Sequence, residues 1–195
     1  CMIEHIPELI DSGIDSFKIE GRMKTALYVA TVARTYRKAI DDYLESPELY
    51  RENMDWYLDQ ISNCTYRQFT TGFFFGKPDE SAQIYDNNTY VKEYTYLGII
   101  GECTADGLYR IEQRNKFSVG EQIEIMKPDG KNIPVVVRRI VDEEGQEMQS
   151  APHPKQVLYI ELAAAENGAL SEAKISEQDN HAAELYDILR RKEEE

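Results

Sequence analysis

Cysteine and histidine are both scarce in this sequence, and their spacing excludes several kinds of site. The chain has three cysteines, none close to another: Cys1, Cys64 and Cys103. Neither a zinc knuckle nor a dithiol motif is predicted from such a pattern, which is typical of a reducing compartment. The three histidines, His5, His153 and His181, include no pair one helical turn apart. The spacing of a metallopeptidase is therefore also missing.

A long apolar run is missing too. No segment approaches the roughly 20 apolar residues that cross a bilayer, and the first residues lack the basic-then-apolar layout of a signal peptide. We therefore expect a cytoplasmic protein with no membrane partner. Because the chain begins with Cys1, we expect it to be a piece of a longer protein, although Met2 leaves open an added residue.

An excess of basic residues is the third feature that the sequence lacks. Asp and Glu outnumber Lys and Arg by 36 to 22, which gives a net charge of −14. RNA would be repelled at long range, so an RNA-binding face requires a local basic patch. The candidates for this patch are Arg110, Arg114, Lys116, Arg138 and Arg139, with Tyr109 and Phe117 as stacking groups. The same residues fit equally well a seam with another domain, in which arginines pair with acids.

The first part of the chain has helical periodicity, interrupted once. Apolar residues at helical spacing predict a helix over 3–12, which Gly13 would end, and two further helices over 23–44 and 54–62. Between the first two, Ser16 to Glu20 alternates in the manner of a strand. Helix, turn, strand and helix in this order are typical of an α/β unit.

Beyond about residue 90 the pattern changes to short β-rich runs. These runs are separated by the turn signals ADG, SVG, PDG and DEEG. Such regular turns predict a small closed barrel or sandwich. We place the domain boundary between Gly76 and Tyr90, where the sequence is polar and lacks periodicity. The fold class predicted is α+β.

The predicted strand is unusual because one of its faces is charged. Lys18, Glu20 and Arg22 lie together near its carboxyl end, where chemistry gathers in α/β units. A fixed carboxylate and a guanidinium could orient an anionic substrate there. The alternative is an edge strand whose charged face meets water.

Five segments carry a resemblance to a known family. They occur in family order and are Ile3–Asp41 (IEHIPELIDSGIDSFKIEGRMKTALYVATVARTYRKAID), Thr65–Gly76 (TYRQFTTGFFFG), Ile111–Gly130 (IEQRNKFSVGEQIEIMKPDG), Ala151–Gln156 (APHPKQ) and Asp187–Arg191 (DILRR). Together they resemble the peptidase U32 family, the so-called collagenase-like proteases.

This resemblance implies a fold. Family members have a TIM-like barrel that supplies the active site, followed by a small antiparallel β-barrel similar to those of translation factors. Residues 1–47 would hold the last strand and helix of the catalytic barrel, 48–87 a helical and aromatic connector, 88–165 the β-barrel, and 166–195 an acidic tail with a short helix. The missing catalytic barrel would be the partner of this chain. Without it, the strand at 16–20 would pair with a second copy in a homodimer, pair with the β-barrel, or fray.

The resemblance also implies a function. Relatives make 5-hydroxyuridine at the tRNA wobble position in a prephenate-dependent reaction, and related proteins carry a four-iron cluster on four cysteines. Lys18, Glu20 and Arg22 would contribute to the active site of the intact enzyme, and Cys1 would be one cluster ligand, although this chain alone would hold no cofactor and be inactive. The alternatives are the family's historical role as a collagenase-like peptidase and a non-catalytic β-barrel module that binds RNA or protein.

Overall fold

The structure is a computed structural model that describes residues 1–63, 69–78, 94–165 and 183–193. The chain divides into two compact units, Cys1–Glu93 and Tyr94–Glu195. The expected boundary segment between Gly76 and Tyr90 lies mostly outside the described residues. Among the residues that are described, no helix combines the length and the apolarity that a membrane span requires.

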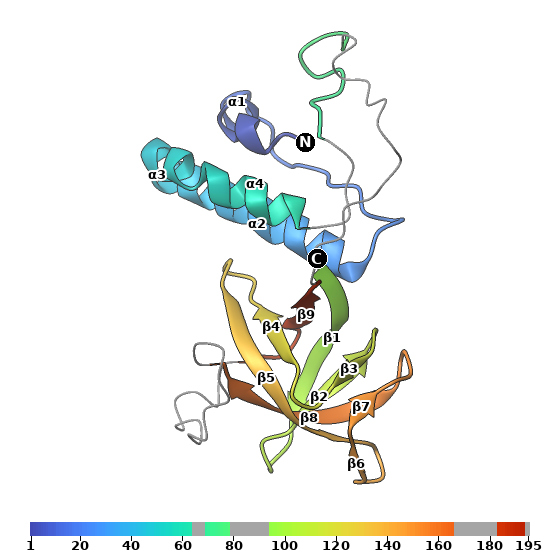
Figure 1. The fold of residues 1–195 in the computed structure, drawn as a ribbon. Coiled ribbons are helices and arrows are strands. Elements are labelled where there is room, and N and C mark those ends of the chain that lie inside the picture. The colour runs from blue at the N-terminus through green and yellow to red at the C-terminus, as the bar shows by residue number, and fades with distance from the viewer. Residues whose placement is uncertain (64–68, 79–93, 166–182, 194–195) are drawn as a thin grey trace. The chain divides into compact units, whose positions relative to one another are not determined.

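The first unit is helical (Figure 1). A 3-10 turn, η1 (Ile3–His5), leads into α1 (Ile6–Asp11), and Gly13 follows with a φ of +75°, the left-handed conformation that ends helices. The long helix α2 (Ala26–Glu45) begins at Thr25, whose side chain accepts a hydrogen bond from the Tyr28 N–H. α4 (Met54–Ser62) has the predicted bounds.

A further helix, α3 (Pro47–Glu52), was not predicted. The Ser46-Pro47 pair ends α2 and also begins α3. The Ser46 hydroxyl accepts hydrogen bonds from the N–H groups of Glu48 and Leu49, and Pro47 occupies the first turn, where a missing N–H costs nothing.

Packing of this unit depends on tyrosines. Tyr50 and Tyr57 are buried and stacked, with ring centroids 5.8 Å apart. The Tyr57 hydroxyl donates to Asp42, which also accepts from Asn53 (2.9 Å) and Lys38 (3.1 Å). Burial alone would raise the pKa of Asp42, but these hydrogen bonds and the Lys38 charge outweigh it and hold the pKa below its usual value. A charged Asp42 therefore joins α2, α3 and α4.

The predicted strand at Ser16–Glu20 is not formed. Residues 14–21 run as an extended but unpaired stretch between α1 and α2, visible as the long blue trace in Figure 1. A strand needs a neighbour for its backbone groups, and the described residues supply none here. Of the three expected outcomes for this segment, the chain by itself shows the unpaired one.

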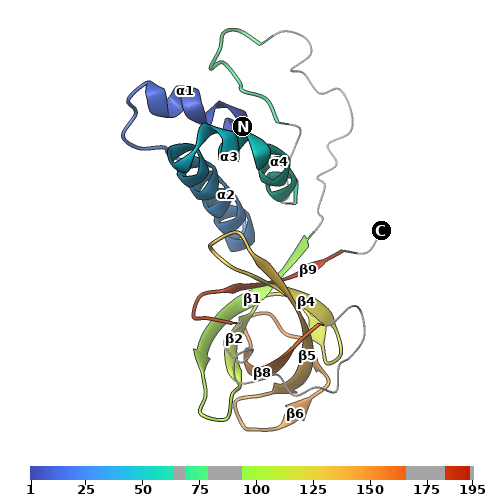
Figure 2. The same ribbon diagram turned by 90° about the vertical axis from the view of Figure 1, so that its left-hand side faces the viewer.

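The second unit is a closed antiparallel β-barrel. Its sheet has the order β4-β9-β1-β2-β8-β5-β6, and the additional pairing of β4 with β5 closes a ring of six strands (Figure 2). Strand bounds are β1 (Tyr94–Cys103), β2 (Tyr109–Gln113), β3 (Phe117–Ser118), β4 (Gln122–Met126), β5 (Asn132–Val141), β6 (Glu147–Met148), β7 (Ser150–Ala151), β8 (Val157–Ala164) and β9 (Ile188–Lys192). The short pair β3–β7 forms a separate sheet. The prediction of helices followed by a small closed barrel is confirmed.

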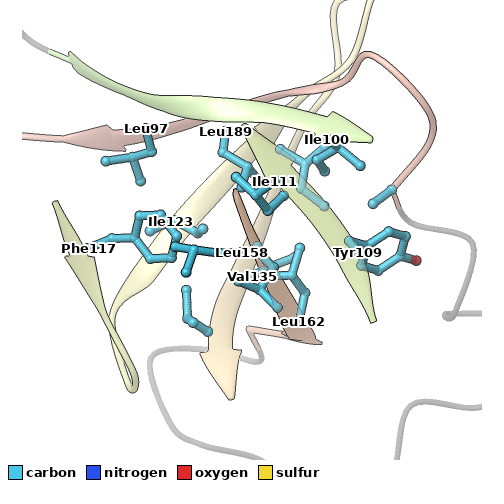
Figure 3. Packing of buried hydrophobic residues seen from close by; sticks show 14 of the residues in the cluster. Leu97, Ile100, Tyr109, Ile111, Phe117, Ile123, Val135, Leu158, Leu162 and Leu189 are labelled. Carbon is cyan, nitrogen blue, oxygen red and sulfur yellow. The ribbon is translucent and has the colours of Figure 1, made fainter. Parts of the chain in front are cut away.

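Alternating side chains fill the barrel (Figure 3). In β2 the residues at 109, 111 and 113 are buried while those at 110 and 112 are exposed, as a half-buried strand requires. Ile111 pairs with Ile100 on one side and with Leu158 on the other, and all three are fully buried. The interior is therefore a packed core rather than a channel.

The tail prediction was wrong for the last described residues. Residues 188–192, expected in an acidic tail with a short helix, form β9, which pairs with β1 and β4. Arg190 lies at 1% exposure within it, 3.8 Å from the centre of the Tyr94 ring and 2.9 Å from Glu124. Residues 166–182 of the expected tail lie outside the described part.

We expect Arg190→Ala to destabilise the barrel by about 3 kcal/mol, the low end of the cost of breaking a buried ion pair. The reason is that Glu124 and Tyr94 lose a buried cation together. Urea unfolding followed by circular dichroism measures the change. Arg191→Ala is the matched control: its pair with Glu121 is about one-third exposed, and its loss should cost less than about 1 kcal/mol. Equal effects of the two variants would contradict the role given to Arg190.

Candidate active site in the helical unit

The unpaired stretch at 14–21 borders a cavity of about 480 Å³ within the helical unit. Ser16, Phe17, Lys18, Ile19 and Glu20 all line it. Its other walls come from the N-terminal residues, from α2 and α4, and from the loop at 69–78; they are Cys1, Met2, Leu9, Ile14, Tyr28, Val32, Tyr36, Ile61, Phe69 and Phe74. The lining is mainly apolar, with a few polar groups that converge from separate segments, as in most ligand pockets.

Two of the three predicted catalytic residues lie at this cavity. Lys18 and Glu20 line the cavity, whereas Arg22 does not, and all three are exposed. The Arg22 backbone N–H donates to Oε1 of Glu20 at 2.9 Å, and the Lys24 N–H donates to the Gly21 carbonyl oxygen. Glu20 is thus held by the turn that follows it, and Arg22 is the second residue of that turn.

Gly21 is required at this turn by packing. A Cβ added at this position would lie 2.6 Å from Cγ2 of Val29 on α2, closer than carbon atoms approach. The glycine therefore lets the turn rest against the first part of α2 and sets the distance of Glu20 from that helix.

Cys1, the predicted cluster ligand, also lies at this cavity. Its Sγ is 3.5 Å from the Tyr36 hydroxyl oxygen, which in turn accepts the Met2 N–H at 2.8 Å. Burial raises the pKa of the Tyr36 phenol, which is neutral at physiological pH even without this shift. Cys103 is exposed in the other unit, and Cys64 lies outside the described residues. Across the described ranges no group of three or more His, Cys, Asp or Glu side chains is arranged to hold a metal ion.

Sequence reasoning missed the aromatic wall of the cavity. The sequence predicts only a helical and aromatic connector over 48–87. The structure brings Phe69 and Phe74 of this stretch opposite Tyr36 and Tyr28 of α2 as cavity lining. The available signal was the run of three phenylalanines between Gly72 and Gly76, because such a run in a turn leaves large aromatic side chains exposed.

The candidate RNA-binding residues divide into two groups on the barrel. Arg110 of β2 and Arg139 of β5 lie on the outer side of the neighbouring strands around β8, where Arg110 pairs with Tyr159 and Arg139 pairs with Glu161. Arg139 also forms an ion pair with Glu147 at 2.8 Å. Arg138 lies beside Arg139, at the irregularity in the β5–β8 pairing.

Arg114 and Lys116 form the second group, in the turn after β2. Arg114 forms an ion pair with Glu112. The Arg191 guanidinium, which belongs to the segment predicted as a tail, donates to the Lys116 carbonyl oxygen at 3.3 Å and pairs with Glu121 at 2.8 Å. Arg191 thus belongs to this group although it lies about 70 residues later in the sequence. No local sequence pattern could predict this contact.

Both expected stacking groups are unsuited to that role. Phe117 is fully buried and Tyr109 is 7% exposed, because both side chains point into the barrel core. Neither can meet an RNA base without unfolding the barrel. The five cations of the two groups therefore remain as the predicted RNA-binding residues, without the two stacking groups.

Family models match both units. The model of peptidase family U32 matches residues 1–84, and that of the peptidase family U32 C-terminal domain matches residues 92–176. The chain belongs to peptidase family U32. Each unit of this U32 chain therefore has its own counterpart in the family, in the order predicted from the sequence.

Three curated relatives have informative names. A tRNA hydroxylation protein P1 of Bacillus subtilis is 37% identical over 83% of this chain and 38% of its own length. A tRNA hydroxylation protein P of Escherichia coli is 33% identical over 77% of this chain and 32% of its own length. A protein named collagenase from Porphyromonas gingivalis is 29% identical over 65% of this chain and 35% of its own length. The U32 chain thus spans about a third of the length of these relatives.

We expect Gly21→Ala to destabilise the helical unit by about 1 kcal/mol, because the new methyl group overlaps Val29. Val29→Ala on the same background should restore most of the loss, since it removes the overlapping atom. Thermal unfolding of the single and double variants measures the coupling between the two positions. Additive effects would show that the turn does not rest on Val29.

Proposed function

We propose that this U32 chain is part of an enzyme that hydroxylates uridine at the wobble position of tRNA, in a prephenate-dependent reaction that forms 5-hydroxyuridine. The observation that carries the proposal is the 37% identity to a tRNA hydroxylation protein over 83% of the chain. A second relative with the same kind of name, from a distant bacterium, supports it. A role in tRNA modification would place the protein in the cytoplasm.

The cavity at 14–21 is the proposed reaction site. Lys18 would bind an anionic group, either a substrate carboxylate or a phosphate, as a point charge. Glu20, held by the Arg22 N–H, would accept a hydrogen bond or a proton from the substrate. Arg22 lies beyond the turn and would contact a substrate that extends out of the cavity.

The unpaired stretch supports a second part of the proposal. Residues 14–21 have free strand edges and would complete a TIM-like catalytic barrel whose other strands lie outside this chain. A homodimer would satisfy the same edges and remains the alternative partner. The closed six-stranded unit would take the place of the barrel that resembles translation factors.

Cys1 is proposed as one ligand of a four-iron cluster. Its sulfur is partly buried and lies beside the Tyr36 hydroxyl, a donor of the kind that tunes cluster thiolates. When bound, such a cluster supplies a one-electron redox centre. The described residues bring no three further ligands together, so the remaining ligands would come from outside them.

Peptidase activity is the second candidate function, and the relative named collagenase favours it. A peptidase needs a nucleophile with a base, or a metal-bound water. Of the described histidines, His5 contacts Glu8 and Phe75, and His153 is exposed in the loop before β8. Among the described residues neither histidine is hydrogen-bonded to a serine, threonine or cysteine side chain, so the nucleophile–base pair is missing there and hydroxylation ranks first.

We expect Glu20→Gln to lower tRNA 5-hydroxyuridine by at least about a hundredfold, the low end of general acid–base contributions. Glutamine keeps an oxygen that can accept the Arg22 N–H, so the turn stays intact while the charge is lost. Mass spectrometry of tRNA from cells that lack the gene, complemented with the complete reading frame, measures the product. Lys18→Ala should behave similarly.

The matched control is Glu45→Gln, which removes an exposed carboxylate at the end of α2 without touching the cavity. It should restore hydroxylation as well as the wild type does. An unchanged tRNA profile in the deletion strain itself would overturn the hydroxylation proposal and favour the peptidase or binding-module alternative.

The barrel cations are proposed to hold the tRNA backbone. We expect Arg110→Glu and Arg138→Glu to weaken tRNA binding and to reduce the slope of log affinity against log salt by about 1 for each lost phosphate contact. Fluorescence anisotropy over a salt series measures both. Lys131→Glu makes the same charge change in the exposed β4–β5 turn and should have a smaller effect. A lower stability with an unchanged salt slope would assign these arginines to a domain seam instead.

A further inference from the structure

We infer that the cavity at 14–21 receives a single unstacked nucleobase of the RNA substrate, and that Phe74 is the side chain on which this base stacks. The inference rests on the proposed function and goes further, because it gives the cavity a ligand class and names a binding residue outside the predicted catalytic set.

Aromatic rings form one wall of the cavity and are available at its opening. Phe69 and Phe74 are 40% and 57% exposed, although both line the cavity. Exposed aromatic side chains on a positioned loop are the usual platform for single-stranded bases, because every base has a π-face. An apolar core residue would be covered, whereas about half of the Phe74 side chain is exposed.

Phe74 is held in place by its neighbours. Its N–H donates to the Thr71 carbonyl oxygen at 3.2 Å, and its ring meets that of Phe75 edge-on, with centroids 5.4 Å apart. The Phe75 ring in turn lies 4.5 Å from the His5 ring at the start of the helical unit. A contact chain from η1 to the loop therefore fixes Phe74, and little ordering is needed when a base binds.

Other residues of the cavity lining carry polar groups that can form hydrogen bonds with the edge of a base. The Tyr36 hydroxyl is oriented by the Met2 N–H and stays neutral, so it can both donate and accept. Glu20 and Lys18 supply an acceptor and a donor from the unpaired stretch. Uracil presents two carbonyl oxygens and one N–H, which such a set can match.

The segment that borders the cavity carries cations that can bind the phosphates of a nucleotide. Residues 16–24 contain three cations, Lys18, Arg22 and Lys24, and one carboxylate, Glu20, in a chain whose net charge is −14. Lys24 places its Nζ 5.2 Å from the ring centre of Tyr28, which lines the cavity. Lys18 at the cavity and Lys24 beside Tyr28 thus supply positive charge for the phosphates of a bound nucleotide.

The cavity volume limits what can enter. At about 480 Å³ it lies within the range of small-molecule pockets, roughly 300–1,000 Å³. One nucleotide fits such a space, whereas a stacked helix does not, so the base would have to leave its stack. Sequence-specific RNA recognition commonly works on such splayed bases in loops.

The test compares two adjacent phenylalanines in the protein expressed from its complete reading frame. The probe is a fluorescein-labelled oligouridylate, with an abasic oligomer of the same length as the reference for phosphate binding alone. We expect the wild type to prefer oligouridylate by at least about fivefold, the low end of base–aromatic stacking. Phe74→Ala should abolish this preference, and Phe74→Trp should keep it.

Phe73→Ala is the matched control, because Phe73 is 79% exposed in the same loop but does not line the cavity. It should leave the preference unchanged. Equal binding of the two probes by the wild type, or equal effects of Phe73→Ala and Phe74→Ala, would overturn the inference. Near-ultraviolet circular dichroism and the retained affinity of Phe74→Trp exclude loss of the fold as the cause.

The outcome is separable from that of the hydroxylation proposal. If Phe74 leaves the probe preference unaffected while Glu20→Gln still abolishes tRNA hydroxylation, the base-stacking role fails and the proposed function stands. If the Phe74-dependent preference is found but tRNA from the deletion strain is unchanged, the cavity binds a nucleobase and the proposed reaction fails.

Discussion

The second unit depends on one insertion, that of β9 between β1 and β4. Those strands do not pair with each other, so the ring closes only through the pairs that β9 forms with both. Arg190 makes this insertion specific, because its guanidinium occupies a buried position that Tyr94 of β1 and Glu124 of β4 share. Leu189 adds a fully buried side chain to the core. Closure and core formation are therefore a single event.

In the helical unit, by contrast, one extended stretch of described backbone has no strand beside it. Its helices bury their apolar faces around Tyr50 and Tyr57, but the stretch at 14–21 has none of the pairing that its extended form is suited to. The cavity is lined by this stretch together with residues of α2 and of the 69–78 loop. Polar side chains and unpaired backbone therefore lie together at this cavity.

Local rules explain the elements that the sequence predicted well. The bounds of α4, the end of α1 at Gly13 and the alternation in β2 follow from periodicity and turn chemistry within a few residues. The misses have non-local causes. Residues 188–192 look like part of an acidic tail until β1 and β4 are present, and 16–20 looks like a strand although a strand requires a partner.

In the candidate site, too, some residues could be predicted from local sequence and others could not. Lys18, Glu20 and Cys1 were predicted, and all three line the cavity. Arg22 was grouped with them by alternation, which the turn at Gly21 interrupts. The shared cavity of Phe74 and Tyr36 could not be predicted from the sequence, because nothing in the spacing of 69–78 and α2 indicates it. Burial likewise removed Phe117 from the RNA candidates, since its side chain direction depends on the β3–β7 pair.

The place of β9 in the chain has a consequence for synthesis. Tyr94 pairs with Lys192, so the first strand of the barrel must wait for nearly the whole unit to be translated before its partner exists. Until residue 192 leaves the ribosome, β1 and β4 expose the edges that β9 will cover, and pairings so distant in sequence form slowly. The newly made barrel is therefore exposed to wrong strand pairing for most of its synthesis, whereas the helical unit, made of local contacts, can fold first.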